Sequence, residues 1–453
     1  MFTSLLKIQS DHTLEHHNIR LTLSLAEKWK AKKGDTFTIF FGLMSVIVNI
    51  TSIGDKENAI SASPSLLSYL KLSNVQQIRY HYVSSQKKLF LGPIIAIITE
   101  IQQQKPVTFG SISDFCEEVT LLSEKSSCFF YVTSLSLWDK ETIYGYSLQD
   151  SEWRKEEMPF PSIVYNRIHS RAIEQSNLFQ EWVELLQEYE IPHFNDRFLN
   201  KWEVYQKLLS YPHMKPFLPT SYLFTSRSVL EQSLREFPCV FVKPIYGSQG
   251  KHIFKIKSEP HKLLVDYTTF QREISKEYSS LPELFATLKE NIGKRPYIVQ
   301  QGLPLYTYDE RPVDFRMLCQ KSNGYTWNVT SAVARVSSGD FVSNIAMGGS
   351  ILKIDEVLLS GFEASEVKHM KKLLIELSIE TAKCLSQAYE GVYAEFGMDV
   401  ALDQQGNPWL LEVNVKPSKN MVSSTSIPRP SARALLHYCI ACAKQPLRRN
   451  DSC

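Results

Sequence analysis

Two apolar runs near the C-terminal end of the chain, joined by a short polar turn, constrain its fold most strongly. Residues 396–402 and 408–415 flank the turn Asp403-Gln404-Gln405-Gly406-Asn407. Apolar runs separated by a few polar and glycine residues are typical of two antiparallel strands in a hairpin. We therefore expect a β-hairpin over residues 396–417.

The predicted hairpin carries three side chains with oxygen atoms. Glu412 and Asn414 are two residues apart and share one face of their strand, and hairpin pairing can bring Asp399 beside them. Hard cations such as Mg²⁺ take oxygen ligands and are usually held by one or two carboxylates together with substrate phosphates. The pattern therefore predicts the metal corner of a nucleotide site. A charged, exposed face of an antiparallel hairpin is the alternative.

Length and composition indicate a folded protein of several domains. At about 100 to 200 residues per domain, 453 residues predict two to three domains. With 43% hydrophobic residues, 22% charged residues and 18 glycines, disorder is expected only at the ends. Fifty basic and 48 acidic residues give a formal charge of +2, which is too balanced to suggest nucleic-acid binding or a polybasic membrane anchor.

The cysteines and the apolar stretches indicate whether the protein is in a reducing compartment, is secreted or spans a membrane. The eight cysteines are scattered in mostly apolar surroundings, which suits free thiols in a reducing environment. Residues 1–10 lack an apolar core of signal-peptide length, so we expect no secretion signal. The longest apolar stretch, residues 37–50, is shorter than a membrane span and polar residues interrupt it, so we expect strands there and no membrane span.

Residues 1–194 are expected to hold two domains. Residues 1–90 mix short β-rich runs with turns and predict a small α+β or barrel-like domain, with strands at 21–25, 37–41, 46–50 and 78–83 and a helix at 64–70. From residue 91 to 194, apolar strands alternate with helices, which predicts a parallel, doubly wound layer.

Two arginines follow a strand of that layer. Arg167 and Arg171 come after residues 163–166, where open parallel sheets bind ligands beyond the carboxyl ends of their strands. They could hold an acidic substrate. Unremarkable surface charge is the preferred interpretation, because loops often carry such residues.

Two lysines farther along could meet an anion. Lys201 is expected in the first turn of a helix within 195–209, where the helix dipole disfavours a cation unless a phosphate binds nearby. Lys243 ends a strand before a loop that carries Gly247 and Gly250, and such a loop can offer backbone N–H groups to phosphate oxygens. A plain glycine-rich turn explains this loop equally well.

The following segments resemble parts of a nucleotide site as well. Residues 295–305 predict a strand that runs into a linker able to present backbone groups to an adenine edge, and residues 313–320 predict a strand with Asp314 and Arg316 on one face. Arg335 ends the next strand, Asn344 lies in the loop after it, and residues 365–389 predict a long helix.

Taken in order, these motifs resemble the ATP-grasp superfamily, in particular its glutathione-synthetase-like and glutamate-ligase-like members, and within it the YheC/YheD group. The resemblance covers about residues 91 to 425. It implies an ATP-grasp fold at 195–425, with a lid subdomain at about 215–300. A pre-ATP-grasp α/β domain at 91–194 and a small β-rich domain at 1–90 would precede it, and a C-terminal helix and tail at 426–453 would follow.

The resemblance also implies ATP and Mg²⁺ as cofactors and a role for each site residue. Lys201 and Lys243 would hold the α- and β-phosphates, with Lys243 also near the adenine. Arg316, Arg335 and Asn344 would be catalytic at the γ-phosphate or an acyl phosphate. The remaining implied contacts are Gly247, Ser248, Gln249 and Gly250 as a mobile lid over the phosphates, Gln300, Gln301 and Leu303 at the adenine, Asp314 at the ribose, and Asp399, Glu412 and Asn414 at Mg²⁺.

The activity implied is the ATP-dependent joining of a carboxylate and an amine through an acyl phosphate, with an acceptor that Arg167 and Arg171 would suit if it is anionic. The resemblance further implies a role in sporulation, residence in the mother-cell cytoplasm and spore coat, and contact with coat proteins. A non-catalytic structural or assembly protein of the coat that retains the nucleotide-binding fold is the main alternative. Phosphoryl transfer to a different acceptor is a third.

Overall fold

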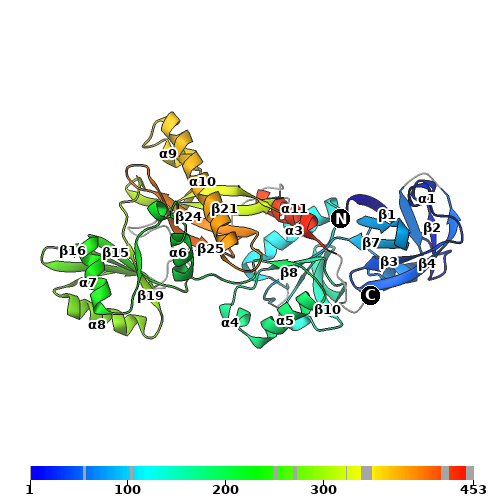
Figure 1. The fold of residues 1–453 in the computed structure, drawn as a ribbon, viewed down its shortest axis with the longest axis horizontal. Helices are drawn as coiled ribbons and strands as arrows, with labels where there is room; N and C mark the ends of the chain where they lie inside the picture. Colours follow the sequence, from blue (N-terminus) through cyan, green and yellow to red (C-terminus); the bar gives the residue numbers. More distant parts are fainter. Residues whose placement is uncertain are drawn as a thin grey trace.

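The computed structural model describes residues 2–54, 58–102, 106–247, 252–268, 273–322, 324–337, 349–419 and 428–444. The molecule is elongated. A β-barrel forms one end, an α/β layer lies next to it, and the two sheets of the C-terminal half form the other end (Figure 1). Within the described ranges, no helix combines the length and apolar character needed to cross a membrane.

Seven strands close the N-terminal barrel. They are β1 (Ser4–Ser10), β2 (Asn18–Leu21), β3 (Thr36–Phe41), β4 (Met44–Ile53), β5 (Ala59–Ala62), β6 (Gln77–Val83) and β7 (Lys88–Gly92), and two helices, α1 (Leu23–Trp29) and α2 (Pro64–Tyr69), accompany them. The strand order is β1-β5-β2-β4-β3-β7-β6. The barrel confirms the β-rich character predicted for residues 1–90.

The strand expected at residues 21–25 is wrong. β2 ends at Leu21, Thr22 adopts an extended conformation, and α1 begins at Leu23. The sequence Leu-Thr-Leu-Ser-Leu alternates as a half-buried strand does, but the chain buries Leu25, Ala26 and Trp29, which lie on one face of a helix. Packing against the barrel core therefore overrides the local alternation.

The α/β layer contains six strands and three helices, apart from short 3₁₀ turns. They are β8 (Ile94–Ile98), α3 (Ser113–Lys125), β9 (Phe129–Thr133), β10 (Ile143–Gln149), β11 (Glu152–Met158), β12 (Ile163–Asn166), α4 (Arg171–Glu174), α5 (Asn177–Glu188) and β13 (His193–Phe194). The order is β11-β10-β9-β8-β12-β13, and β9, β8, β12 and β13 are parallel. The predicted doubly wound parallel layer is confirmed for these four strands.

An antiparallel hairpin, β10–β11, extends the layer at one edge and was not predicted. β11 reads Glu-Trp-Arg-Lys-Glu-Glu-Met and most of its side chains are exposed, so the sequence carries no apolar alternation to reveal it. On the faces of the layer, α5 packs into the same hydrophobic core as the barrel, and α3 packs into a second core on the other side. The barrel and the layer thus share one continuous core.

The C-terminal half begins with what we term the outer sheet. Its elements are β14 (Ser221–Leu223), α7 (Arg227–Glu236), β15 (Cys239–Pro244), β16 (Phe254–Glu259), β17 (Lys262–Thr268), β18 (Glu273–Tyr278), α8 (Leu281–Ile292) and β19 (Tyr297–Gln301). The strand order is β14-β19-β15-β16-β17-β18, and helices α7 and α8 pack with the sheet around a separate core. Helix α6 (Lys201–Leu209) precedes this unit, as the sequence predicts.

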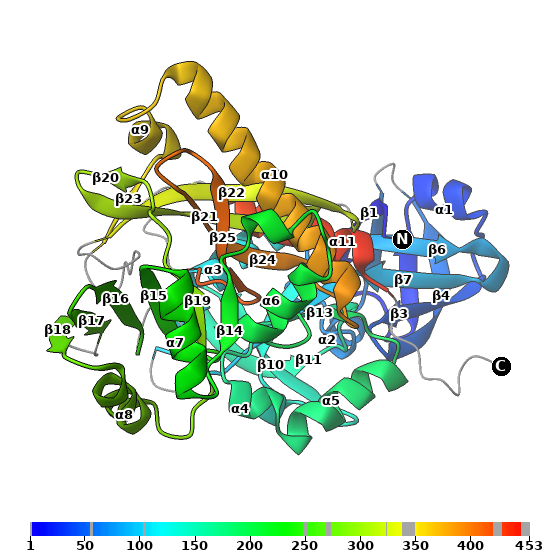
Figure 2. The same ribbon diagram turned by 60° about the vertical axis from the view of Figure 1, so that its left-hand side comes forward.

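The central sheet completes the C-terminal half. Its elements are β20 (Thr307–Tyr308), β21 (Arg311–Ser322), β22 (Thr326–Val336), β23 (Ser350–Leu352), α9 (Ile354–Leu358), α10 (Ala364–Ala388), β24 (Glu395–Leu402), β25 (Pro408–Asn414) and α11 (Pro430–Cys442). The order is β23-β22-β21-β24-β25, with β20 beside β21. Figure 2 shows the outer sheet and the central sheet side by side, with the long α10 crossing the central sheet.

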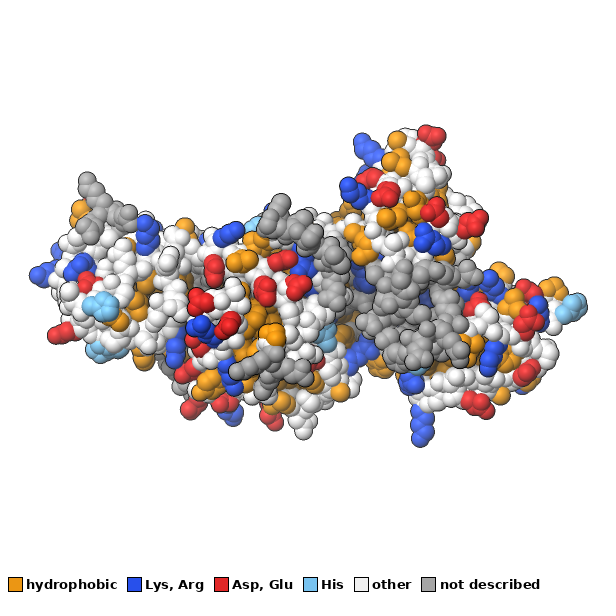
Figure 3. All heavy atoms as spheres, turned by 180° about the vertical axis from the view of Figure 1, so that it is seen from behind, with side chains coloured by type: hydrophobic (Ala, Val, Ile, Leu, Met, Phe, Trp, Pro, Cys, Tyr) orange, Lys and Arg blue, Asp and Glu red, His pale blue; other side chains and the backbone are white. Residues whose placement is uncertain are grey.

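Side-chain alternation along β21 decides which face of the central sheet can carry chemistry. Val313, Phe315 and Met317 are fully buried in the core that includes α10. Asp314 and Arg316 point to the opposite face, because successive strand residues alternate. The face drawn in Figure 3 gives no comparable signal, since basic and acidic side chains intersperse over its described part.

Candidate functional site

Asp399 and Glu412 are direct cross-strand partners on β24 and β25, and Gly397 pairs with Asn414 two residues away. The register therefore puts Glu412 and Asn414 on the same face as Asp399, as the hairpin predicts. With the Asn414 amide oriented to satisfy its neighbours, its nitrogen donates to Glu412 Oε1 at 3.2 Å and its oxygen accepts from Arg316 Nη1 at 3.2 Å. Three oxygen-bearing side chains thus meet at one corner.

Two arginines converge on the same carboxylate. Arg316 Nε lies 2.9 Å from Asp399 Oδ1, and Arg335 Nη2 lies 3.0 Å from that oxygen. Arg335 Nε also donates to Asp314 Oδ1 at 2.5 Å. Burial alone would lower the pKa of Arg335, but the Asp399 and Asp314 carboxylates outweigh it and raise that pKa. The Arg335 guanidinium is therefore a fixed positive charge beside the candidate metal corner, and the Arg316 guanidinium lies next to it.

The β-ladder explains why these four residues meet. Arg316 on β21 is the cross-strand partner of Asp399 on β24, and Asp314 is the partner of Arg335 on β22. Residues that face each other across a ladder have neighbouring side chains on one face. Asp314 is almost fully buried against Arg335, so its predicted contact with a ribose would require that pair to separate.

Lys201 links the hairpin to the loop after β15. Asn200 caps α6 and makes a capping box with Glu203, which sets Lys201 at the first helical position. From there Lys201 Nζ donates to Glu412 Oε1 at 3.0 Å and to the Gly247 carbonyl at 2.7 Å. An ammonium in this place lies directly beside the oxygen donors of the hairpin.

Lys243 is the second cation of the site. Its Nζ donates to Gln300 Oε1 at 2.8 Å, between adjacent strands of the outer sheet. Burial is the main reason that the pKa of Lys243 is lowered to about 8; the Glu412 carboxylate opposes the shift and the positive charge of Lys201 adds to it. A phosphate group beside Lys243 would favour the charged form.

A cleft between the two sheets connects Lys201, Lys243 and Glu412. One hollow is lined by Lys201, Lys243, Gln300 and Glu412 among others. A second hollow, with about 590 Å³ of space open to solvent, shares Lys243, Gln300 and Leu411 with the first. Its further lining includes Phe241, Gln301, Leu303 and Leu305. An apolar hollow of this size with a few polar groups is typical of small-molecule sites.

The linker after β19 passes close to β15. Gly302 N donates to the Cys239 carbonyl at 2.8 Å. A Cβ atom on Gly302 would lie 2.8 Å from that same oxygen and 2.7 Å from Cys239 Sγ. Only glycine fits without a shift of the backbone, and the tight passage brings Leu303 to the wall of the second hollow.

Several predicted site residues lie outside the described part of the chain. These are Ser248, Gln249 and Gly250 of the expected lid loop, and Asn344. Gly247 is described, and its carbonyl accepts from Lys201.

The sequence-based interpretation of Arg167 as surface charge is wrong. Its side chain is fully buried, with Nη2 donating to the Pro417 carbonyl at 3.0 Å and Nη1 lying 3.5 Å from Glu395 Oε1. Glu395 also accepts from Lys419, a second buried cation. Arg167 therefore joins the α/β layer to the central sheet, with its guanidinium enclosed by protein.

Arg171 behaves differently. Its guanidinium lies over the rings of Phe198 and Tyr246, at 5.1 Å and 5.2 Å from their centroids. Burial lowers the pKa of Arg171, and the nearby Glu412 carboxylate acts in the opposite direction. Arg171 is thus held beside the hairpin corner. Sequence analysis missed the two aromatic rings, since nothing in their local pattern distinguishes them from core residues.

The chain is similar to several known proteins. A family model described as YheC/D-like ATP-grasp matches residues 190–441. The chain is 29% identical over 345 residues to the endospore coat-associated protein YheD of Bacillus subtilis (strain 168), covering 74% of this chain and 75% of that protein. It is 25% identical over 309 residues to YheC of the same organism, covering 67% and 81%. A solved structure of the ATP-grasp ligase PsnB with a minimal precursor aligns with a TM-score of 0.43 and 16% identity, covering 77% of this chain and 99% of that one.

Proposed function

The chain belongs to the family of YheC/D-like ATP-grasp proteins, and from this premise we propose that it is an ATP- and Mg²⁺-dependent ligase. It joins a carboxylate to an amine through an acyl phosphate. The observation that carries the proposal is the cross-strand pair Asp399 and Glu412, with Lys201 bonded to Glu412 and with Lys243 in the adjoining cleft.

ATP would span the two connected hollows. The adenine would lie in the hollow lined by Gln300, Gln301 and Leu303, and the triphosphate would run past Lys243 toward Lys201. The Gly247 carbonyl now accepts from Lys201, so a phosphate that takes over the ammonium would release the start of that loop. Ser248, Gln249 and Gly250 would then cover the phosphates and keep water from the acyl phosphate.

The hairpin corner suits Mg²⁺ by its donor chemistry. Asp399 and Glu412 offer carboxylate oxygens and Asn414 offers an amide oxygen, all on one face. Oxygen ligands from one or two carboxylates are what Mg²⁺ takes in nucleotide sites. When bound there, Mg²⁺ would neutralise charge on the phosphates of ATP.

The fixed arginines supply the rest of the electrostatic stabilisation. A carboxylate substrate is a poor acylating agent because oxide is a bad leaving group, so it must first take the γ-phosphoryl group of ATP. Arg316 and Arg335 lie beside the corner where negative charge builds up during that transfer. Asn344 would support the same end of the nucleotide. An amine then attacks the acyl phosphate and releases phosphate, and no side chain of the protein forms a covalent intermediate.

We further propose that the acceptor carries an anionic group and that Arg171 binds it. The guanidinium is held between Phe198 and Tyr246 and lies near Glu412. An arginine fixed in this way presents a planar set of donors to a carboxylate at little entropic cost. Arg167 drops out of this role because it is buried against Glu395.

The relatives named as endospore coat-associated support a setting for this reaction. We propose that the protein acts in sporulation, in the mother-cell cytoplasm and the spore coat, in contact with coat proteins. One observation favours a non-catalytic coat protein as the second candidate. Asp399 and Glu412 already have cationic partners within the chain, so the corner is electrostatically balanced without a ligand.

An acceptor screen tests the proposal. ATP hydrolysis and product formation are measured with pooled amino acids, peptides and cell-wall fragments for the parent protein, Asp399→Ala, Glu412→Ala and the control Asp355→Asn. Asp355 is an exposed carboxylate paired with Lys371, far from the hairpin in sequence. Activity in the parent and the control that is lost in both hairpin variants supports the ligase. If the parent protein binds ATP but turns it over with none of the acceptors, the result supports the non-catalytic candidate.

A further inference from the structure

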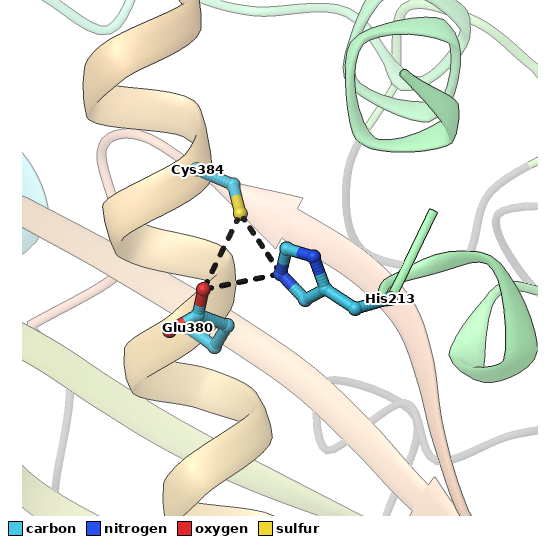
Figure 4. Close-up of side chains that lie close together, drawn as sticks. All are labelled: His213, Glu380 and Cys384. Carbon is cyan, nitrogen blue, oxygen red and sulfur yellow. Dashed lines mark hydrogen bonds and ion pairs between the residues drawn. The ribbon is translucent and has the colours of Figure 1, made fainter. Parts of the chain in front are cut away.

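His213, beside α10, and two side chains of α10 form a group that could hold a metal ion, and none of the three lines either hollow of the cleft. His213, Glu380 and Cys384 bring one nitrogen, one oxygen and one sulfur together (Figure 4). His213 Nε2 lies 3.1 Å from Glu380 Oε1, and Cys384 Sγ lies 3.8 Å from each of these two atoms. Glu380 and Cys384 are four residues apart on one helix, so they share a face, and His213 comes from the segment between α6 and β14.

We propose that His213, Glu380 and Cys384 bind a zinc ion. Zn²⁺ bonds to histidine nitrogen at about 2.0–2.1 Å, to carboxylate oxygen at about 2.0–2.2 Å and to thiolate sulfur at about 2.3 Å, in tetrahedral geometry. Those bond lengths place the ligand atoms roughly 3.3 to 3.6 Å from one another. The observed separations of 3.1, 3.8 and 3.8 Å differ from these by a few tenths of an ångström. Zinc therefore needs only small side-chain adjustments.

The surroundings hold each ligand in place. Tyr211 donates from its hydroxyl to the Cys384 carbonyl at 3.1 Å, and Met214 is buried in the core. The backbone on both sides of His213 is thus anchored to α10 and its core. Glu380 directs Oε1 to the cluster, while its other oxygen accepts from Lys383 at 3.3 Å. Partners of this kind orient metal ligands in known sites.

The ligand types select zinc over the magnesium proposed for the cleft. A thiolate and an imidazole are soft or borderline ligands that suit Zn²⁺, whereas Mg²⁺ takes oxygen ligands. The side chains of His213 and Glu380 are 55% and 39% exposed, so solvent can supply a fourth ligand. Binding forms the Zn–S bond and releases the Cys384 thiol proton to water.

The location gives the ion a structural role. His213 lies between α6, which carries Lys201, and β14 of the outer sheet, whereas Glu380 and Cys384 belong to the helix that packs on the central sheet. A zinc ion would fix the connection between the two sheets to α10. It should stabilise the folded chain whether or not the cleft turns over ATP.

Zinc titration tests the site. Zn²⁺ is titrated against a chromophoric chelator in the presence of excess Mg²⁺, for the parent protein, His213→Gln, Cys384→Ser and His369→Gln. His369 is an exposed histidine on the same helix and serves as the matched control. We expect one zinc ion per chain in the parent and the control, and at least about tenfold weaker binding in His213→Gln.

Cobalt substitution and thermal unfolding provide separate readouts. Co²⁺ should give a thiolate-to-metal charge-transfer band in the parent and in His369→Gln, and none in Cys384→Ser. Zinc should raise the unfolding temperature of the parent but not that of His213→Gln. Because His213 is exposed, this variant tests the proposal even if Cys384→Ser folds poorly. Equal zinc affinity in the parent and His213→Gln, or a charge-transfer band that survives in Cys384→Ser, would overturn the proposal.

Discussion

Lys201 Nζ and Glu412 Oε1 lie 3.0 Å apart, although 211 residues separate them in the sequence. The pair joins the first turn of α6 to the last strand of the central sheet, and the same ammonium holds the Gly247 carbonyl. In the proposed function, a triphosphate that enters the cleft would replace Glu412 as the partner of this lysine, and a metal ion would replace the lysine as the partner of the carboxylate. We therefore propose that nucleotide binding exchanges ion partners within a site that is already charge-balanced.

Removal of the Glu412 charge should lower turnover far more than it lowers nucleotide affinity. In Glu412→Gln, Lys201 loses its carboxylate partner and becomes more available to phosphate, while the proposed metal corner loses a ligand. We expect ATP-dependent turnover to fall by about 100-fold or more, with a much smaller change in metal-free nucleotide affinity. Steady-state kinetics and calorimetric titration with and without Mg²⁺ measure the two effects. Unchanged turnover would exclude Glu412 from the metal corner.

Lys243 should make nucleotide affinity depend on pH. Its pKa is lowered from 10.5 to about 8, and the ammonium attracts phosphate only while it is protonated. ATP affinity should therefore fall as the pH rises above about 8, by up to about tenfold per pH unit. In Lys243→Arg the side chain stays charged over this pH range, so the ATP affinity of this variant should not fall as the pH rises. Identical pH profiles for the two proteins would contradict the contact.

The contribution of Lys243 to folding stability depends on pH in the opposite direction to its contribution to ATP affinity. The unfolded chain binds this proton more tightly than the folded chain, so the stability associated with neutral Lys243 is complete above pH 10.5. It is lost as the pH falls toward about 8. The affinity measurement isolates Lys243 more cleanly, because Lys416 and Lys419 are also buried and have pKa values lowered to about 8.

The linker at Gly302 should tolerate no side chain. In Gly302→Ala the new Cβ would lie 2.8 Å from the Cys239 carbonyl oxygen, so the backbone must shift. We expect a stability loss of about 1–3 kcal/mol and a weaker ATP affinity, because Leu303 moves from the cleft wall. Gly54→Ala is the control, since no atom lies within 4 Å of its added Cβ. Urea unfolding measures the change in stability, and nucleotide titration measures the change in ATP affinity. An ATP affinity of Gly302→Ala equal to that of the wild type would show that the linker does not border the adenine.

Much of the site follows from local sequence periodicity. The alternation along residues 313–320 correctly predicts that Asp314 and Arg316 share a face, and the hairpin over 396–417 correctly predicts that Asp399 lies beside Glu412. That the two sets share one face of the central sheet follows only from the pairing of β21 with β24. The turn between the two C-terminal strands predicts their pairing. Strand alternation is a local property, so a single sequence is enough to read it.

Other features depend on partners that are distant in the chain. Arg167 looks like a loop cation, yet it is buried because Glu395, Pro417 and Lys419 surround it, all more than 200 residues away. The group of His213 with Glu380 and Cys384 likewise forms only on folding. Tertiary contacts of this range leave no periodic signal. The β10–β11 hairpin was missed for a different reason: its strands are neighbours in the sequence, but β11 is mostly charged and exposed and carries no apolar alternation.

The buried Glu395 should be essential for stability. It accepts from the Tyr165 hydroxyl at 2.6 Å and from Gln320 at 2.7 Å, and it balances the charges of Arg167 and Lys419. Glu395→Gln leaves both cations buried without an anion, which should cost about 3–5 kcal/mol. The exposed Glu259→Gln should change stability by less than about 0.5 kcal/mol. Denaturant unfolding measures both, and an equal effect of the two substitutions would contradict this role.

Arg171 should set acceptor affinity without changing nucleotide affinity. Arg171→Met removes the guanidinium between Phe198 and Tyr246 but keeps a long apolar side chain against both rings. For an anionic acceptor we expect the KM to rise by at least about tenfold with the KM for ATP unchanged, because a charge-assisted contact is lost. Parallel increases in both KM values would indicate a general disturbance of the cleft instead.

The central claim is that the cleft between the outer and central sheets binds ATP with Mg²⁺ at the hairpin corner. A crystal structure of the protein with Mg²⁺ and a non-hydrolysable ATP analogue tests it most directly. The account predicts the adenine beside Leu303, the triphosphate between Lys243 and Lys201, and the metal ion on Asp399 and Glu412. An analogue bound elsewhere, or a saturated crystal in which Lys201 still pairs with Glu412 beside an empty cleft, would contradict it.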